Sequence, residues 1–113
     1  MMPPYTYTQI AILGEHVDLQ WLPQRLLTDA YGQTLFEEQE IQLRNEMRGM
    51  QCLDTFIHEV THYISDKCNL ELSEHQVHLL GMAWANIFYA NPELLGFIAE
   101  RMTEEDERRE SKG

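Results

Sequence analysis

The stretch Met50-Gln-Cys-Leu-Asp-Thr-Phe-Ile-His-Glu-Val-Thr-His-Tyr-Ile64 decides how this chain of 113 residues folds. Its apolar residues recur at spacings of three and four, at Met50, Leu53, Ile57, Val60 and Ile64. That period is typical of an amphipathic helix, and Phe56 widens the apolar stripe. We therefore expect a helix that starts near Met47, ends near Asp66 and buries this stripe in a hydrophobic core.

Within this helix, the sequence His58-Glu59-Val60-Thr61-His62 fits the HExxH pattern. Residues four apart lie on one face of a helix, so His58 and His62 can both bind one zinc ion (Zn²⁺) at about 2.0–2.1 Å. Glu59 lies about 100° further round the helix, where it can contact a zinc-bound water without displacing it. Because zinc lowers the pKa of that water to about 7, Glu59 is the expected general base.

A catalytic zinc site needs a third protein ligand and one open position. Glu74 lies twelve residues after His62, in the first turn of the next predicted helix. A turn between the two helices would bring Glu74 towards the ion. Glu74 can also be an ordinary first-turn acid favoured by the helix dipole. Glu71, His75 and His78 are the alternative ligands, and His78 lies one turn beyond Glu74 on the same helix face.

Four other side chains near the motif have a chemical and a structural interpretation. Cys52 and Cys68 do not form a CxxC pair, and we expect reduced thiols, with a Cys68 thiolate as an alternative metal ligand. Tyr63 and Tyr89 carry hydroxyls that could polarise a scissile carbonyl, although each can equally be a half-buried core residue. The sequence leaves these alternatives open.

The residues before Met47 have the pattern of β-strands. Residues 5–13 are rich in β-branched and aromatic residues, and residues 16–22, 31–36 and 40–44 alternate between polar and apolar side chains. Gly14, Pro23 and residues 37–39 supply turns between them. We expect a small antiparallel sheet of three or four strands.

Two more helices are predicted after the motif. Ser73 and Gln76 form a capping box at the start of the second helix, which runs to Ala90. Its predicted apolar face consists of Val77, Leu80, Met82, Ala83, Ile87 and Phe88, and we expect Trp84 to belong to the core. Asn91-Pro92 then starts a third helix.

These patterns predict an α+β fold in which a small N-terminal antiparallel sheet packs on three C-terminal helices. The chain is expected to be one domain over residues 1–113. Residues 1–46 form its β-rich part, residues 47–102 its helical part with the metal site, and residues 103–113 a charged tail that frays.

Composition and charge narrow the classes of function. The net charge of −11 argues against direct nucleic-acid binding, because that binding depends on Lys and Arg neutralising phosphates. No apolar stretch approaches the roughly 20 residues that span a bilayer. Residues 1–13 lack the basic start and long apolar run of a signal peptide. We expect a soluble, cytoplasmic protein with no membrane contact.

Three segments resemble a known family. Thr55-Phe-Ile-His-Glu-Val-Thr-His-Tyr-Ile64, Leu70-Glu-Leu-Ser-Glu-His-Gln-Val77 and Ala90-Asn-Pro-Glu-Leu-Leu95 are similar to small phage and prophage metallopeptidases of the ImmA/IrrE-like group, which have an HExxH-plus-Glu (gluzincin) arrangement. The resemblance covers roughly residues 31–98. It implies a minimal zincin-like domain in which His58, His62 and Glu74 bind zinc and Glu59 is the base. The chain departs from the family at His75 and His78, where acids are common, and at Gly81, where alanine is usual.

The sequence thus favours a zinc metalloendopeptidase that hydrolyses a protein or peptide substrate, in a phage or prophage setting. One alternative is a non-catalytic, zinc-stabilised binding or accessory protein, which a fourth protein ligand such as His78 or Cys68 would favour. Another is a phage accessory protein whose acidity steers it to a basic host factor. The substrate and the oligomeric state cannot be predicted from the sequence.

Overall fold

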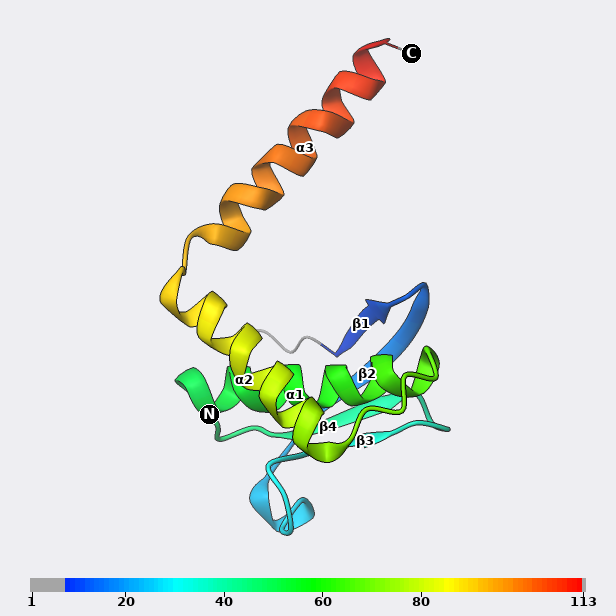
Figure 1. Ribbon diagram of the computed structural model, residues 1–113, viewed down its shortest axis with the longest axis vertical. Coiled ribbons are helices and arrows are strands. Elements are labelled where there is room, and N and C mark those ends of the chain that lie inside the picture. Colours follow the sequence, from blue (N-terminus) through cyan, green and yellow to red (C-terminus); the bar gives the residue numbers. More distant parts are fainter. Residues whose placement is uncertain (1–7, 113) are drawn as a thin grey trace.

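The computed structural model describes the backbone of residues 8–112 and the side chains of residues 8–104. Within these residues, four strands and a short 3-10 helix precede three α-helices, which confirms the predicted α+β fold (Figure 1). The elements are β1 (Gln9–Ile12), β2 (Glu15–Leu22), η1 (Gln24–Leu26), β3 (Gly32–Leu35), β4 (Glu40–Arg44), α1 (Gly49–Lys67), α2 (Glu74–Ala90) and α3 (Leu94–Lys112). Residues 5–7, which we predicted to begin the first strand, lie outside the described residues.

The sheet has the strand order β1-β2-β4-β3 and is mixed. The β1–β2 and β3–β4 pairs are antiparallel hairpins, whereas β2 and β4 run parallel, with Asp18 opposite Glu40 and Leu22 opposite Arg44. The expected antiparallel arrangement is therefore wrong for this pair. β3 begins at the end of the sheet where β2 stops and runs back, and β4 then runs in the same direction as β2 and lies between the two strands. Alternating polarity predicts a strand but not its direction.

Arg44 stabilises the connection between β2 and β3. Its side chain is buried, and its guanidinium donates to the backbone carbonyls of Leu27 at 2.8 Å and Thr28 at 2.9 Å. The guanidinium also stacks on the Tyr31 ring, 4.6 Å from the centroid. The buried guanidinium holds the connection because its donors are satisfied by these backbone carbonyls.

The hydrophobic core lies between the sheet and α1. Its buried residues come from β1, β2, β4, the β4–α1 connection and α1, and they are Ile12, Val17, Leu19, Ile41, Leu43, Met47 and Tyr63. From α1, Phe56, Val60 and Ile64 pack against them, as the helical stripe predicted. Because this face of α1 packs on the sheet, the opposite face, which carries the two motif histidines, points towards α2 and β3.

Helix α2 packs on α1 through small residues. Its buried positions are Val77, Gly81 and Ala85, each four residues apart. A Cβ atom on Gly81 would lie 3.4 Å from the His58 Cα, so the two helices approach closely at this point. The larger residues flank this contact and stay 40–49% exposed: Leu80, Met82, Trp84 and Ile87. The expectation that Trp84 belongs to the core is therefore wrong, whereas Val77 of the predicted apolar face is buried.

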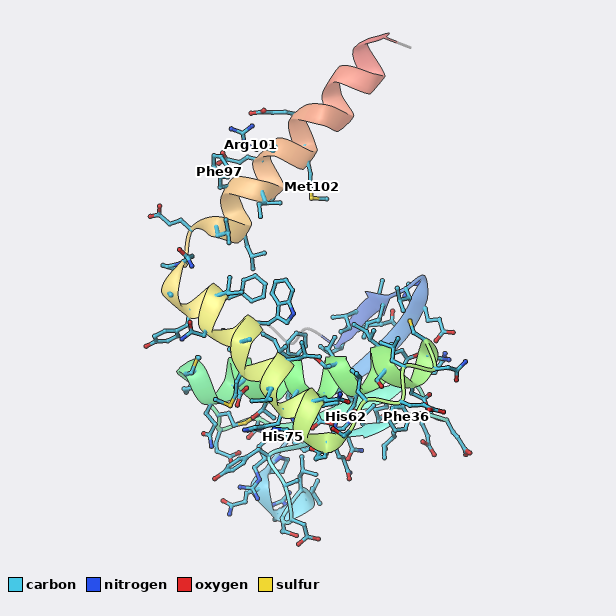
Figure 2. All side chains as sticks on the ribbon, viewed as in Figure 1. Phe36, His62, His75, Phe97, Arg101 and Met102 are labelled. Carbon is cyan, nitrogen blue, oxygen red and sulfur yellow. The ribbon has the colours of Figure 1, made fainter. Side chains whose placement is uncertain are left out.

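Helix α3 extends away from the sheet and the other helices (Figure 1). Figure 2 shows Phe97, Arg101 and Met102 along it, remote from the motif histidine His62. The helix continues to Lys112, so the expected frayed tail from residue 103 is helical. The Glu and Arg residues that suggested a solvated tail are also good helix formers. Within residues 8–112, no helix is long and apolar enough to cross a membrane.

Candidate metal centre

The two motif histidines lie one turn apart on α1 and point to the same place. Their Nε2 atoms are 3.2 Å apart, and their side chains are 21% and 24% exposed for His58 and His62. Two nitrogens bound to one tetrahedral zinc at about 2.0–2.1 Å would lie about 3.3 Å apart. The helix therefore presents the imidazoles at the separation that one shared ion requires.

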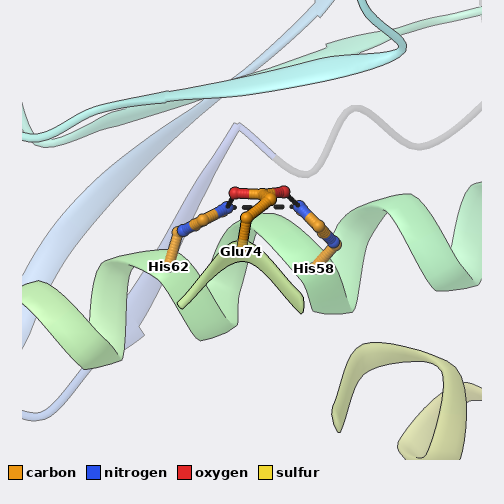
Figure 3. Close-up of side chains that lie close together, drawn as sticks. All are labelled: His58, His62 and Glu74. Carbon is orange, nitrogen blue, oxygen red and sulfur yellow. Dashed lines mark hydrogen bonds and ion pairs between the residues drawn. The ribbon is translucent and has the colours of Figure 1, made fainter. Parts of the chain in front are cut away.

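Glu74 completes the group from the first residue of α2. One carboxylate oxygen lies 2.9 Å from the His58 Nε2 and the other 3.0 Å from the His62 Nε2 (Figure 3). One ligand atom from each of these three residues lies within 4.8 Å of the others. The Glu74 side chain is 70% exposed, so the group opens to solvent on this side.

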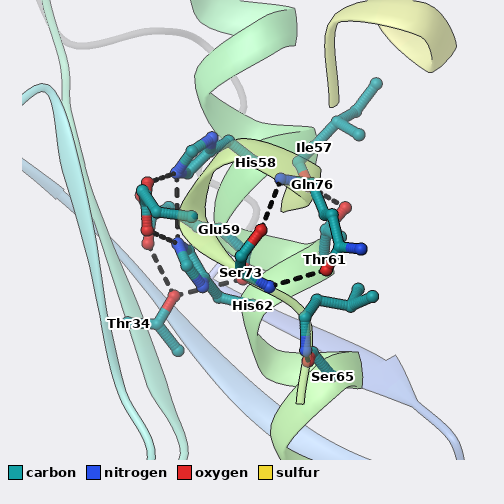
Figure 4. Close-up of polar contacts among 11 residues, drawn as sticks. Thr34, Ile57, His58, Glu59, Thr61, His62, Ser65, Ser73 and Gln76 are labelled. Carbon is teal, nitrogen blue, oxygen red and sulfur yellow. Dashed lines mark hydrogen bonds and ion pairs between the residues drawn. The ribbon is translucent and has the colours of Figure 1, made fainter. Parts of the chain in front are cut away.

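The connection between α1 and α2 sets the position of Glu74. The N–H of Leu70 donates to the Ser65 carbonyl at 3.0 Å, and the N–H of Leu72 donates to the Ser65 hydroxyl at 3.2 Å. Ser73 then accepts from the N–H of Gln76, whose side chain accepts from the N–H of Ser73. This is the predicted capping box (Figure 4). Because hydrogen bonds fix both ends of this connection, α2 begins beside the two histidines.

Glu59 lies beside this group but is held by the sheet. It is 7% exposed, and its Oε1 atom accepts a hydrogen bond of 2.7 Å from the Thr34 hydroxyl on β3 (Figure 4). The same hydroxyl lies 3.1 Å from the Glu59 backbone carbonyl. A buried carboxylate needs such a donor, because burial without one is unfavourable. The general base predicted from the motif therefore contacts a strand residue that the motif does not include.

A cleft of about 550 Å³ brings β3 and the candidate ligands together. Its walls come from β3 and its neighbours on one side and from α1 and the start of α2 on the other. The lining residues are Ala30, Tyr31, Gly32, Gln33, Thr34, Phe36, Asp54, Thr55, His58, Glu59, His62 and Glu74. A substrate in this cleft would touch the edge strand, the candidate base and the candidate metal ligands at once.

The alternative ligands are not part of the three-residue group. His78 faces His58 with ring centroids 6.4 Å apart, and His75, Glu71 and Cys68 are exposed. Within the described residues, the group that could hold a metal consists of His58, His62 and Glu74 alone. The geometry thus favours Glu74 over the other candidates as the third ligand.

The two tyrosines considered for polarising a carbonyl lie elsewhere. Tyr63 is fully buried, and its hydroxyl donates to Glu15 at 2.6 Å on the sheet side of α1. Tyr89 is 63% exposed in the last turn of α2 and does not line the cleft. Thr61 donates to the Ile57 carbonyl at 2.7 Å within α1.

A polar cluster fixes the C-terminal part of α1 to the sheet. Glu15 accepts from Tyr63, from Lys67 at 2.9 Å and from Gln39 at 2.9 Å. The bond from Tyr63, followed by that from Lys67, lowers the pKa of Glu15. Burial and then the bond to Glu15 raise the pKa of Tyr63, and the bond to Glu15 raises the pKa of Lys67. On α1 the cluster starts at Tyr63, one residue after His62, so it holds the helix that carries the candidate ligands against the sheet.

Thr34 is the site residue that the sequence did not indicate. Its stretch, residues 31–36, predicted a strand, but nothing in an alternating strand shows that one hydroxyl faces a helix far along the chain. The order β1-β2-β4-β3 makes β3 the strand at the sheet edge beside α1. Only that arrangement brings Thr34 to Glu59.

The side chains present fit zinc. Two imidazole nitrogens and one carboxylate form a ligand set that catalytic zinc sites use, with one position left for water or substrate. The opening of the group to solvent at Glu74 gives an ion a route to the three donors. No family model, no curated protein and no solved structure matches this chain. The function is therefore inferred from this geometry and from the resemblance of the motifs.

Proposed function

We propose that this chain is a zinc-dependent endopeptidase that hydrolyses peptide bonds in a protein or peptide substrate. The observation that carries the proposal is the convergence of the His58, His62 and Glu74 donor atoms, all within 4.8 Å of one another, beside the buried carboxylate of Glu59. A binding site for a structural ion would not require a buried acid next to it. A hydrolytic site requires one as a base.

Each residue has a role in this reaction. His58, His62 and Glu74 would hold Zn²⁺, which supplies a Lewis acid that polarises the carbonyl and acidifies a coordinated water. Glu59 takes the proton of the attacking water and delivers it to the amine that leaves. Its burial and its bond to Thr34 keep the carboxylate beside the reacting groups.

The cleft also suggests how a peptide would bind. β3 is the last strand of the sheet and lines the cleft, and within the described residues no strand pairs with its outer edge. An extended peptide could add to this edge through backbone hydrogen bonds. Such bonds do not depend on the peptide's side chains, and they would place a scissile bond near the metal ligands. This fits a protein or peptide substrate better than a small molecule.

A second candidate is a zinc-stabilised binding or accessory protein without turnover. The observation in its favour is that the three donors join α1 to α2, so that a bound ion would hold the two helices together. That reading needs a fourth protein ligand. Cys68 and His78 are not in the donor group of the described residues, which weakens it.

The biological setting is part of the same proposal. A phage or prophage association rests on the resemblance of residues 31–98 to the small ImmA/IrrE-like metallopeptidases. The proposed cytoplasmic location rests on the same resemblance.

The test compares wild type with Glu59→Gln. Both proteins are loaded with zinc and incubated with an unbiased library of synthetic peptides, and new termini are identified by mass spectrometry. We expect cleavage by wild type, a loss of about 10²–10⁴-fold in Glu59→Gln, and about one zinc per chain in both. Equal cleavage by the two zinc-loaded proteins would refute the assigned role of Glu59 and the peptidase proposal with it.

A further inference from the structure

Glu59 is the one buried acidic side chain among the described residues. Within the same part of the chain, the Thr34 hydroxyl is the only donor to its carboxylate, at 2.7 Å. The donor does not come from α1, which carries Glu59, but from β3, twenty-five residues earlier. The orientation of the candidate base is thus set by the strand that lines the other side of the cleft.

The geometry of this contact restricts the carboxylate. The Thr34 hydroxyl has one hydrogen and two acceptors on the same residue, Oε1 at 2.7 Å and the Glu59 carbonyl at 3.1 Å. The shorter distance favours donation to Oε1. With Oε1 held by β3, the Oε2 atom is the one left to accept a proton from water.

We propose that Thr34 is a positioning residue for Glu59, which holds the carboxylate in the orientation that the hydrolytic reaction needs. The inference rests on the proposed peptidase function. It adds that the strand on which a peptide would lie and the base that activates water are joined by one hydrogen bond. Because Thr34 acts through Glu59, its loss should slow turnover without weakening substrate binding.

Thr34→Val isolates this contact. Valine has nearly the shape of threonine but leaves the buried Glu59 carboxylate without its donor, so the carboxylate is free to rotate away from β3. Thr34→Ser keeps the hydroxyl and should restore the contact. Thr61→Val is the matched control, since it removes a half-buried hydroxyl whose bond goes to the Ile57 carbonyl in the same helix.

The first readout is kinetic. The three variants and wild type, each loaded with zinc, are compared on the library peptide that wild type cleaves best. We expect kcat for Thr34→Val to fall about 10–100-fold with KM unchanged, because small misplacements of a reacting group cost about that much. Thr34→Ser and Thr61→Val should stay within about twofold of wild type. Wild-type kcat in Thr34→Val, or a Thr34→Ser as slow as Thr34→Val, would overturn the inference.

The second readout does not need a substrate. Crystal structures of the zinc-loaded proteins should show the Glu59 carboxylate turned away from its wild-type position in Thr34→Val and unmoved in Thr34→Ser and Thr61→Val. If wild type cleaves no library peptide, the peptidase proposal fails, and the role of Thr34 is judged from these structures. An unmoved carboxylate in Thr34→Val would then reject the positioning role.

Discussion

The contact between Gly81 and His58 links helix packing to the metal centre, and it can be perturbed in graded steps. Gly81 is buried on α2, two turns after Glu74, and faces the backbone of the first candidate ligand. A Cβ atom at this position would lie 3.4 Å, 3.5 Å and 3.6 Å from the Cα, N and Cβ atoms of His58. These distances are those of ordinary van der Waals contact, so one methyl group fits and a larger side chain does not.

Gly81→Ala and Gly81→Val should therefore change the stability of the folded protein in opposite directions. Gly81→Ala gains the helix preference of alanine over glycine, about 0.8–1 kcal/mol, which corresponds to a rise of about 3–6 °C in the melting temperature. Gly81→Val places further carbons about 1.5 Å beyond the Cβ, inside contact distance of the His58 backbone. We expect a loss of about 1–3 kcal/mol from overpacking. Because α2 must then move away from α1, Glu74 moves as well and zinc binds more weakly.

The assay measures both effects. Thermal unfolding by circular dichroism in EDTA gives the stability of each protein without metal, and competition with a chromophoric chelator gives its zinc affinity. We expect Gly81→Ala to be at least as stable as wild type with equal zinc affinity, and Gly81→Val to be less stable and to bind zinc more weakly. A Gly81→Val protein with wild-type stability and wild-type zinc affinity would show that the α1–α2 contact does not set the position of Glu74.

Three further predictions concern the elements around the site. Ser73→Ala removes the capping box and should lower the free energy of unfolding by about 1 kcal/mol, measured by urea unfolding. Zinc affinity should also drop, because Glu74 directly follows Ser73. An unchanged urea midpoint would contradict the role of the cap. Gly32→Ala puts a Cβ 3.0 Å from side-chain carbons of Leu43 and Thr55, so we expect a loss of about 1–3 kcal/mol in the same assay, and a neutral effect would argue against the close approach of β3 to α1. The lowered pKa of Glu15 means that its bonds stabilise the folded protein above about pH 4.5 and are lost as the pH falls through the lowered value. In EDTA, the stability of wild type should therefore decline below about pH 4.5 more steeply than that of Tyr63→Phe, and identical slopes would rule out this source of acid sensitivity.

The sequence predicted those features that depend on local periodicity. The apolar stripe from Met50 to Ile64 indicated α1, and Ser73 with Gln76 indicated the start of α2, because helix spacing and caps are properties of neighbouring residues. The same local logic placed His58 and His62 on one helix face. It also favoured Glu74, since a short turn after α1 leaves little choice of where α2 can begin.

The features that the sequence did not predict depend on how elements meet. The parallel pairing of β2 and β4 follows from a chain path that alternation of polarity cannot encode. Trp84 and Leu80 are apolar but half exposed. The contact with α1 is formed by Val77, Gly81 and Ala85, because two helices can approach closely only where the side chains between them are small. The contact between Thr34 and Glu59 depends on the position of β3 beside α1, which the sequence pattern does not show.

Zinc binding by the three-residue group is the claim on which the rest depends. Metal content after zinc loading and exhaustive dialysis tests it directly, on wild type, Glu74→Ala, a His58→Ala/His62→Ala double variant and the control His78→Gln. We expect about one zinc per chain in wild type and in His78→Gln, and loss of zinc in the other two. A wild type that retains no zinc, or a double variant that still retains it, would show that these three residues do not form a zinc site.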